Sequence, residues 1–190
     1  KEWLQEFPAT VDINDSPELQ ETYPDTKKKG GRYVLRIPWD MVPAYFSSHP
    51  EYMSRDGWRN SEVARCSDTV RAYDNIAGKL DALLAEYGYV REGDHYRVEK
   101  ESRETVTFFC HFGVTCAMLA HLWNVSPFIL WHSLALLPTS FTEVVTEERQ
   151  KGIAYFRALH VGDTSHLRMG GEAPSFACRF CEVYSDESRH

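Results

Sequence analysis

The sequence predicts an α/β domain, and the segment around residue 111 carries this prediction. Residues 104–110 (ETVTFFC) are mostly β-branched and aromatic, which is typical of a short buried strand. His111 and Gly113 follow, and then an Ala/Met/Leu-rich segment with helical spacing. We therefore expect a strand, a turn and a helix, with His111 at the turn, where open α/β sheets place their ligand sites.

His111 has two interpretations. In the functional one, the free N–H groups at the helix start and the positive end of the helix dipole favour an anion, phosphate above all, beside the imidazole ring. In the structural one, the histidine caps the strand and bonds to a nearby carbonyl group. The residue pattern alone leaves both open.

The composition is that of one globular domain. The chain has 190 residues, of which 43% are hydrophobic, enough for one sizeable core. The net charge of −7 argues against a broad surface for nucleic acid or anionic membrane, so we expect neither partner. No apolar stretch has the length of a membrane span, and the N-terminus does not resemble a signal peptide. We expect a cytoplasmic protein.

The five cysteines predict neither a disulfide framework nor a metal centre. Their number is odd and their spacing is irregular. The pair Cys178-x-x-Cys181 has a spacing seen in metal and redox sites, but it has no second pair and lies near the C-terminus. We expect no metal and no cofactor.

The first sixty residues are expected to contain little regular structure. Residues 8–31 are polar, contain three prolines and end in a lysine and glycine run, so we expect a long surface loop. Residues 32–38 alternate in polarity like a short strand. Trp39, Tyr52 and Trp58 lie in or near an aromatic-rich stretch; they are candidates for pocket walls, although such side chains pack on the core at least as often.

The middle of the chain predicts a long amphipathic helix and a hairpin. Ser61 is a candidate N-cap, and apolar residues then recur at three- and four-residue steps as far as Gly88. Residues 89–98 contain a Glu-Gly-Asp turn between two short extended pieces, which indicates a hairpin.

The segments after the central helix predict one more helix and two strands. Ser126 and Pro127 indicate the start of a short helix that covers residues 128–135. Residues 139–146 and 153–160 are expected to be strands joined by a charged turn. His121, on the central helix, is expected to pair with a neighbour on the surface. Residues 1–167 are expected to form a single domain, and residues 168–190 a loosely held tail.

Taken together, these segments resemble the histidine phosphatase superfamily, in its phosphoglycerate-mutase-like branch. Residues 108–123 (FFCHFGVTCAMLAHLW) are similar to the family's second-histidine motif, and residues 4–7 (LQEF) to the segment with its acidic catalytic residue. The long helix before this motif and residues 137–142 and 162–167 after it occur in the family's order over most of the chain. The resemblance implies a three-layer sandwich with a mostly parallel central sheet flanked by helices, and makes residues 8–60 a substrate-side insertion.

The sequence also departs from the family pattern. Members begin with a strand ending in Arg-His-Gly, whose histidine is the nucleophile, and a later segment supplies a second arginine for the phosphate; neither is found. His49 and His95 lack the strand and the flanking residues. We therefore expect the chain to start part-way into the fold. Phe112 stands where the family usually has glycine directly after the histidine.

The function that the resemblance implies is a metal-independent phosphatase, which hydrolyses a small phosphorylated metabolite through a phosphohistidine. His111 holds the phosphoryl group, Glu6 is the general acid, and the N–H groups of Phe112 and Gly113 bind phosphate. By residue type alone, Glu6 is more commonly an exposed acid. An inactive relative that binds a phosphate ligand, or a regulatory one, stays open, as does a less favoured phosphoglycerate-type mutase. Expected partners are a small phosphorylated substrate or inorganic phosphate, and a homodimer is left open.

Overall fold

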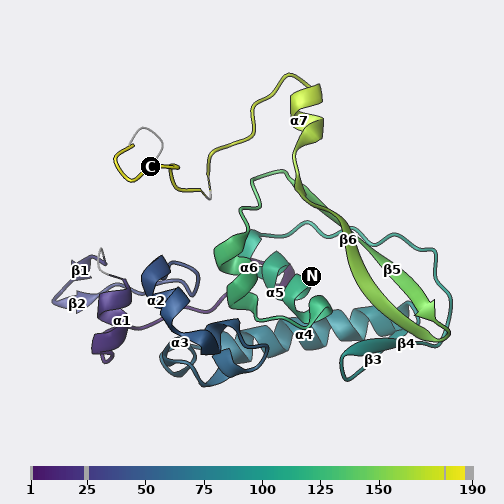
Figure 1. Ribbon diagram of the computed structural model, residues 1–190, viewed down its shortest axis with the longest axis horizontal. Coiled ribbons are helices and arrows are strands. Elements are labelled where there is room, and N and C mark those ends of the chain that lie inside the picture. Colours follow the sequence, from purple (N-terminus) through teal and green to yellow (C-terminus); the bar gives the residue numbers. More distant parts are fainter. Residues whose placement is uncertain (1, 24–25, 178, 187–190) are drawn as a thin grey trace.

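The computed structural model describes residues 2–23, 26–177 and 179–186, and helix α5 (Phe112–Trp123) lies at its centre (Figure 1). The residues of α5 are apolar on nearly every side, so the helix is buried almost all round. The longest helix, α4 (Thr69–Glu86), packs against it through a stripe of apolar residues at three- and four-residue spacing. α6 (Pro127–Ser133) packs on α5 after a short turn.

Short helices and turns make up the rest of the helical structure. Asn124 has a left-handed backbone, with φ of 56°, and ends α5. The shorter helices of the described residues are α1 (Pro17–Thr22), α2 (Pro43–Ser48), α3 (Glu62–Arg65), α7 (Ser165–Met169) and 3₁₀ turns at Glu2–Leu4, Pro50–Met53 and Gly57–Asn60. None of the helices in the described ranges is long and apolar enough to cross a membrane.

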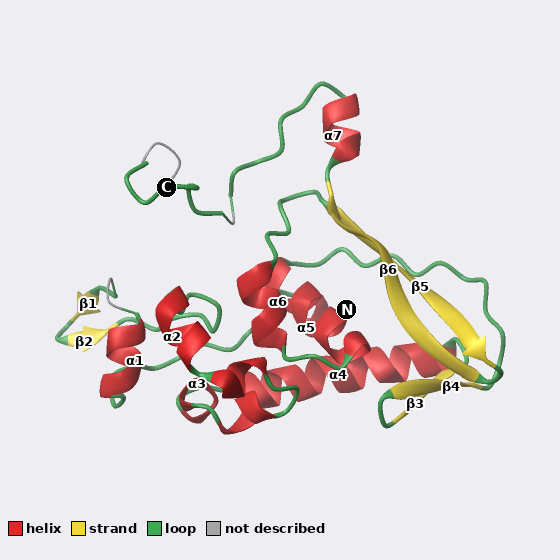
Figure 2. Ribbon diagram, viewed as in Figure 1, coloured by secondary structure: helices red, strands yellow, loops and turns green. Residues whose placement is uncertain are grey.

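The strands are antiparallel throughout the described residues (Figure 2). The larger sheet has the order β3-β4-β6-β5, formed by β3 (Tyr89–Glu92), β4 (His95–Val98), β5 (Phe141–Gln150) and β6 (Ile153–Asp163). A small second sheet pairs β1 (Lys28–Lys29) with β2 (Arg32–Tyr33). The three-layer sandwich with a mostly parallel central sheet is therefore wrong. The reason is local: two-residue turns with positive φ at Gly93 and Gly152 join neighbouring strands, and such turns can only give antiparallel pairs.

The predicted strand at residues 104–110 is also wrong. The backbone groups of Thr105 to Cys110 make no hydrogen bond with the described residues, and the Phe109 side chain is 90% exposed. Phe108 and Cys110 turn toward the core, and the Phe108 ring meets that of Trp3 at 6.0 Å. Apolar and β-branched residues form a strand only when another backbone lies alongside to pair with them. The helix that follows nevertheless begins at the turn, as expected.

The first sixty residues are more ordered than predicted. Residues 8–31 contain α1 and contribute side chains to the main core, namely Ala9, Val11, Ile13, Leu19 and Tyr23. Tyr52 and Trp58, the candidate pocket walls, are 0% and 1% exposed, so they are core residues. The expected strand at residues 32–38 is reduced to β2 and one bridge between Val11 and Arg36.

Elements with a local start or stop signal are confirmed. The Ser126 hydroxyl accepts a hydrogen bond from the Phe128 amide at 3.2 Å and Pro127 opens α6. The hairpin of β3 and β4 and the two later strands are present. The predicted long helix differs in one respect: it is divided at residues 66–68 into α3 and α4. It ends just before Gly88, whose φ is 93°.

His132 is a partly buried histidine of α6 with an unpaired ring nitrogen. Its Nδ1 donates to the Phe128 carbonyl at 2.8 Å, and its buried Nε2 has no partner in the described residues. The ring stacks on Phe46, with centroids 4.4 Å apart. Burial lowers the pKa of His132, an effect that the bond to Phe128 opposes only in part.

We expect His132 to make stability depend on pH. Because its pKa is lowered in the folded chain, the unfolded chain takes up the proton first as pH falls below about 6.5, and the free energy of unfolding decreases from there down to the folded pKa. His132→Phe keeps the ring stack and should reduce this pH dependence in urea unfolding. The same change at the exposed His166 is the control; equal effects of both changes would contradict the assignment.

Candidate functional site

The N-terminal end of α5 is where the sequence-predicted residues meet. His111 is the N-cap residue, with an extended backbone, and its side chain makes no capping bond. Its carbonyl accepts from the amide of Thr115 at 3.0 Å and from its hydroxyl at 2.7 Å. The imidazole makes no hydrogen bond with the described residues and is exposed. The ring is therefore free to contact a ligand.

Glu6 reaches this helix end from the other end of the sequence. Its Oε1 accepts hydrogen bonds from the amide of Gly113 at 2.9 Å and from the amide of Phe7 at 2.7 Å. An anionic oxygen at a helix start satisfies an otherwise unpaired N–H group and meets the positive end of the dipole. The helix start thus binds an anion in this structure, and that anion is the protein's own carboxylate.

Gly113 is required by the close approach of three side chains. A Cβ atom at this position would lie 2.6 Å from Trp39, 2.7 Å from Glu6 Oε1 and 2.8 Å from Phe7 Cβ. The Gly113 carbonyl is held from the other side by the indole N–H of Trp131 at 3.0 Å. The backbone of α5 is therefore locked against the N-terminal segment at the site.

Aromatic rings form one wall of the site. Trp39 packs edge-on against Phe112 at 5.8 Å, and Phe7 lies 4.9 Å from Trp131. Trp39 was one of three candidate pocket walls, and it alone lies at the site. Trp131 was missed, because nothing in the sequence distinguishes it from the other apolar residues of its helix.

The thiol next to the site is not an activated nucleophile. Burial raises the pKa of Cys110, and the bond with Thr115 at 3.2 Å opposes this only in part. Burial likewise raises the pKa of Cys116 to about 12. A cysteine nucleophile needs a lowered pKa, so neither thiol fits that role.

The described residues contain no group of three or more His, Cys, Asp or Glu side chains placed to hold a metal ion. Cys178 lies outside the described residues, so the spacing with Cys181 has no structural account.

The fold and this site define a mixed α/β protein with an antiparallel sheet and a helix start that binds the carboxylate of Glu6. Comparison of the chain with protein-family models, with curated proteins and with solved structures finds no match.

We expect Gly113→Ala to destabilise the protein by about 1–3 kcal/mol, because the added methyl group must displace Trp39 or Glu6 from a packed position. The matched control is Gly78→Ala in α4, where a Cβ meets nothing within 4 Å and the exchange should stabilise the helix by about 0.5–1 kcal/mol. Urea unfolding measures both changes. Equal small effects would show that the close packing at Gly113 contributes nothing.

Proposed function

We propose that the protein acts on a small phosphate ester at the N-terminal end of α5, as a metal-independent phosphatase of the histidine phosphatase type. The observation that supports this most is the hydrogen bond of Glu6 to the Gly113 amide beside His111. It joins segments 107 positions apart, and the resemblance assigns a site residue to each of them. The proposal rests on this juxtaposition and not on the arrangement of the sheet.

The chemistry assigned to this chain is phosphate binding and proton transfer. A phosphoryl oxygen takes the place of Glu6 Oε1 on the amide of Gly113 and also accepts from the amide of Phe112, where the helix dipole favours negative charge. The free imidazole of His111 holds a second oxygen as charge shifts during transfer. Glu6, displaced from the amide, protonates the leaving oxygen and then draws a proton from water. The attacking nucleophile is not assigned to a residue of this chain.

One observation favours a second candidate, a relative that binds a phosphate ligand without hydrolysing it. The Glu6 carboxylate competes directly with phosphate for the Gly113 amide. An anion must therefore displace an internal carboxylate, which suits reversible binding as well as turnover. A phosphoglycerate-type mutase has no separate observation in its favour.

The first test is His111→Ala. We expect turnover of an aryl phosphate to fall by at least about a hundredfold, because the variant loses a donor to the transferring phosphoryl group. His166→Ala, which removes another exposed histidine, is the control and should leave turnover unchanged. Near-normal turnover of His111→Ala would remove His111 from the site. Phosphate binding that depends on His111, without any turnover in the unaltered protein, would select the second candidate.

The second test is chelation. Since the proposal assigns charge stabilisation to backbone amides and histidine, we expect turnover to survive dialysis against EDTA without change. Loss of turnover, restored by adding back a divalent cation, would point to a metal-dependent reaction and would exclude the proposed mechanism.

A further inference from the structure

Positive charge is concentrated in one short segment of the chain. Residues 27–36 (KKKGGRYVLR) hold five of the 21 lysines and arginines and none of the 28 aspartates and glutamates. They contain the hairpin of β1 and β2, which turns through Gly30 and Gly31 with φ of 59° and 81°. Figure 1 shows this hairpin at one end of the longest axis of the molecule, away from α5. The cations are therefore gathered on one peripheral element of a chain whose net charge is −7.

One face of the hairpin carries three of these cations. Lys29 lies opposite Arg32 in the strand register. The Val34 amide donates to the Lys27 carbonyl at 3.0 Å, so these two residues are opposite each other as well. Opposite residues of an antiparallel pair share a face, and side chains alternate along each strand. The same face therefore carries exposed side chains at four positions: Lys27, Lys29, Arg32 and Val34.

Carboxylates do not neutralise the lysines of the hairpin. None of the three lysines at 27–29 forms an ion pair with the residues that the structure describes. Arg32 pairs with Asp12 at 3.5 Å, but the two side chains are 65% and 46% exposed, so this pair is weak. Only Arg36 has a closer partner, Asp40, at 3.0 Å. The lysines thus provide most of the positive charge that an outside partner would meet.

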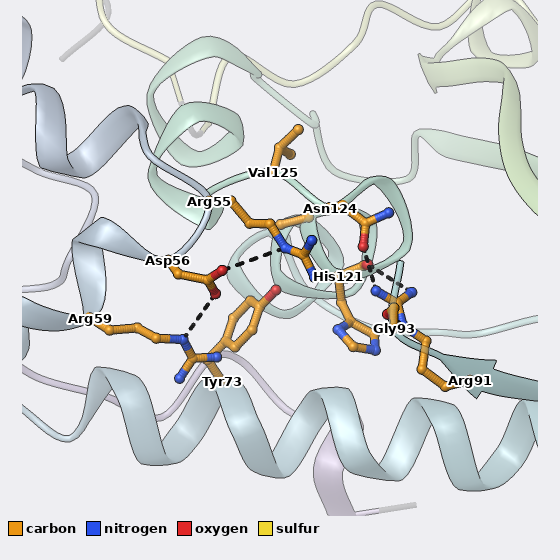
Figure 3. Close-up of a pocket in the computed structure, with 10 residues that line it drawn as sticks. Arg55, Asp56, Arg59, Tyr73, Arg91, Gly93, His121, Asn124 and Val125 are labelled. Atoms are coloured by element: carbon orange, nitrogen blue, oxygen red, sulfur yellow. Dashed lines mark hydrogen bonds and ion pairs between the residues drawn. The ribbon is translucent and has the colours of Figure 1, made fainter. Parts of the chain in front are cut away.

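The arginines around a cavity at the C-terminal end of α5 differ, because neighbouring side chains hold them. The cavity has a volume of about 260 Å³, and Arg55, Arg59 and Arg91 are among its lining residues. Figure 3 shows Asp56 between the first two of these arginines, paired with both. It also shows Arg91 bonded to the side chain of Asn124. These guanidinium groups have partners within the protein, whereas the lysines of the hairpin face solvent.

Aliphatic side chains lie next to the cations of the hairpin. Val34 is 37% exposed and Leu35 is 56% exposed. Tyr33 lies on the opposite face from Val34, where the Lys28 ammonium group is 4.3 Å from the centroid of its ring. The exposed surface of the hairpin thus combines ammonium and aliphatic groups, while its aromatic ring is covered.

We propose that the hairpin of β1 and β2 binds the surface of a lipid bilayer that contains anionic lipids. Lys27, Lys29 and Arg32 lie among the charged headgroups, and Val34 enters the boundary between headgroups and acyl chains. This inference is independent of the function proposed at the start of α5.

Two features favour a lipid surface over nucleic acid. Single-stranded nucleic acid is held largely by bases that stack on exposed aromatic rings, and the ring of Tyr33 is covered by Lys28. An aliphatic side chain such as Val34 gains little beside a phosphate backbone, but it is stabilised by leaving water at the acyl boundary.

The charge of the rest of the chain determines how the protein approaches such a surface. All 28 acidic residues lie outside residues 27–36, so an anionic surface repels the remainder of the molecule. Attraction between the hairpin and the headgroups extends over about 10 Å at 0.1 M salt. Only contact through the hairpin end is therefore favourable, and it should weaken as salt is added.

The test is sedimentation of the full chain with phosphatidylcholine vesicles that contain or lack phosphatidylserine. We expect binding only to the vesicles with phosphatidylserine, and less of it at higher salt. The combined change Lys27→Gln, Lys28→Gln and Lys29→Gln should weaken binding at least about tenfold, because each lysine near an anionic surface contributes a factor of about five.

The matched control is the combined change Lys79→Gln, Lys100→Gln and Lys151→Gln. It removes the same charge from three exposed lysines outside the hairpin. We expect it to change binding by less than about twofold, because these lysines are not gathered at the contact. Equal losses in the two triple variants would show that binding follows net charge alone, and would overturn the proposal.

A second pair of variants tests the aliphatic contact. Val34→Ser should weaken binding about threefold, because a hydroxyl group replaces the methyl groups at the acyl boundary. Val161→Ser on β6, where the side chain is similarly exposed at 40%, should leave binding unchanged. The proposal is overturned if vesicles with phosphatidylserine do not bind, or if Val34→Ser has no more effect than Val161→Ser. It is also overturned if a short RNA or DNA binds through the hairpin lysines more tightly than the vesicles do.

Discussion

The structure depends on the burial of α5. A helix that is apolar on nearly all sides removes its own backbone ends from water, and those ends then need partners. At its start the partner is Glu6, 107 positions away, and at its end Arg91 reaches Asn124 across 33 positions. These polar contacts are few, but they fix where the N-terminal segment and β3 lie against the helix. The remaining elements pack into the space that this arrangement leaves.

The antiparallel sheet is a consequence of local closure. The two strands of each hairpin are joined by a two-residue turn. Pairing them therefore costs little chain entropy and needs no crossover connection. A parallel sheet through residues 104–110 needs a second backbone on each side of that segment. In the described residues β5 and β6 pair with each other instead, and the Phe109 side chain is exposed to solvent.

The sequence predicted the elements that carry their own signals, but not their pairing. Ser126 with Pro127, Gly88 and the turn at Gly93 each act through neighbours in the chain, so α6, the end of α4 and the first hairpin could be derived. Other features depend on contacts between residues far apart in the sequence. These are the choice of strand partners, the burial of Tyr52 and the packing of residues 8–31 into the core. The same distinction applies to the polar contacts. Glu6 and Gly113 were brought together only through a resemblance between segments, and the bond of His121 to Asp81 spans 40 positions with no local pattern to indicate it.

The two ends of α5 also differ in electrostatic character, and this affects how each can bind an anion. The helix dipole places about half a positive charge at the start and about half a negative charge at the end. At the start the dipole attracts an anion directly, and Glu6 already uses this attraction. At the end the dipole repels anions, and Arg91 donates to the His121 carbonyl there, so part of its charge is offset by the helix itself. The positive charge at the start of α5 is thus carried by fixed backbone groups, whereas at its end it is carried by the Arg91 side chain.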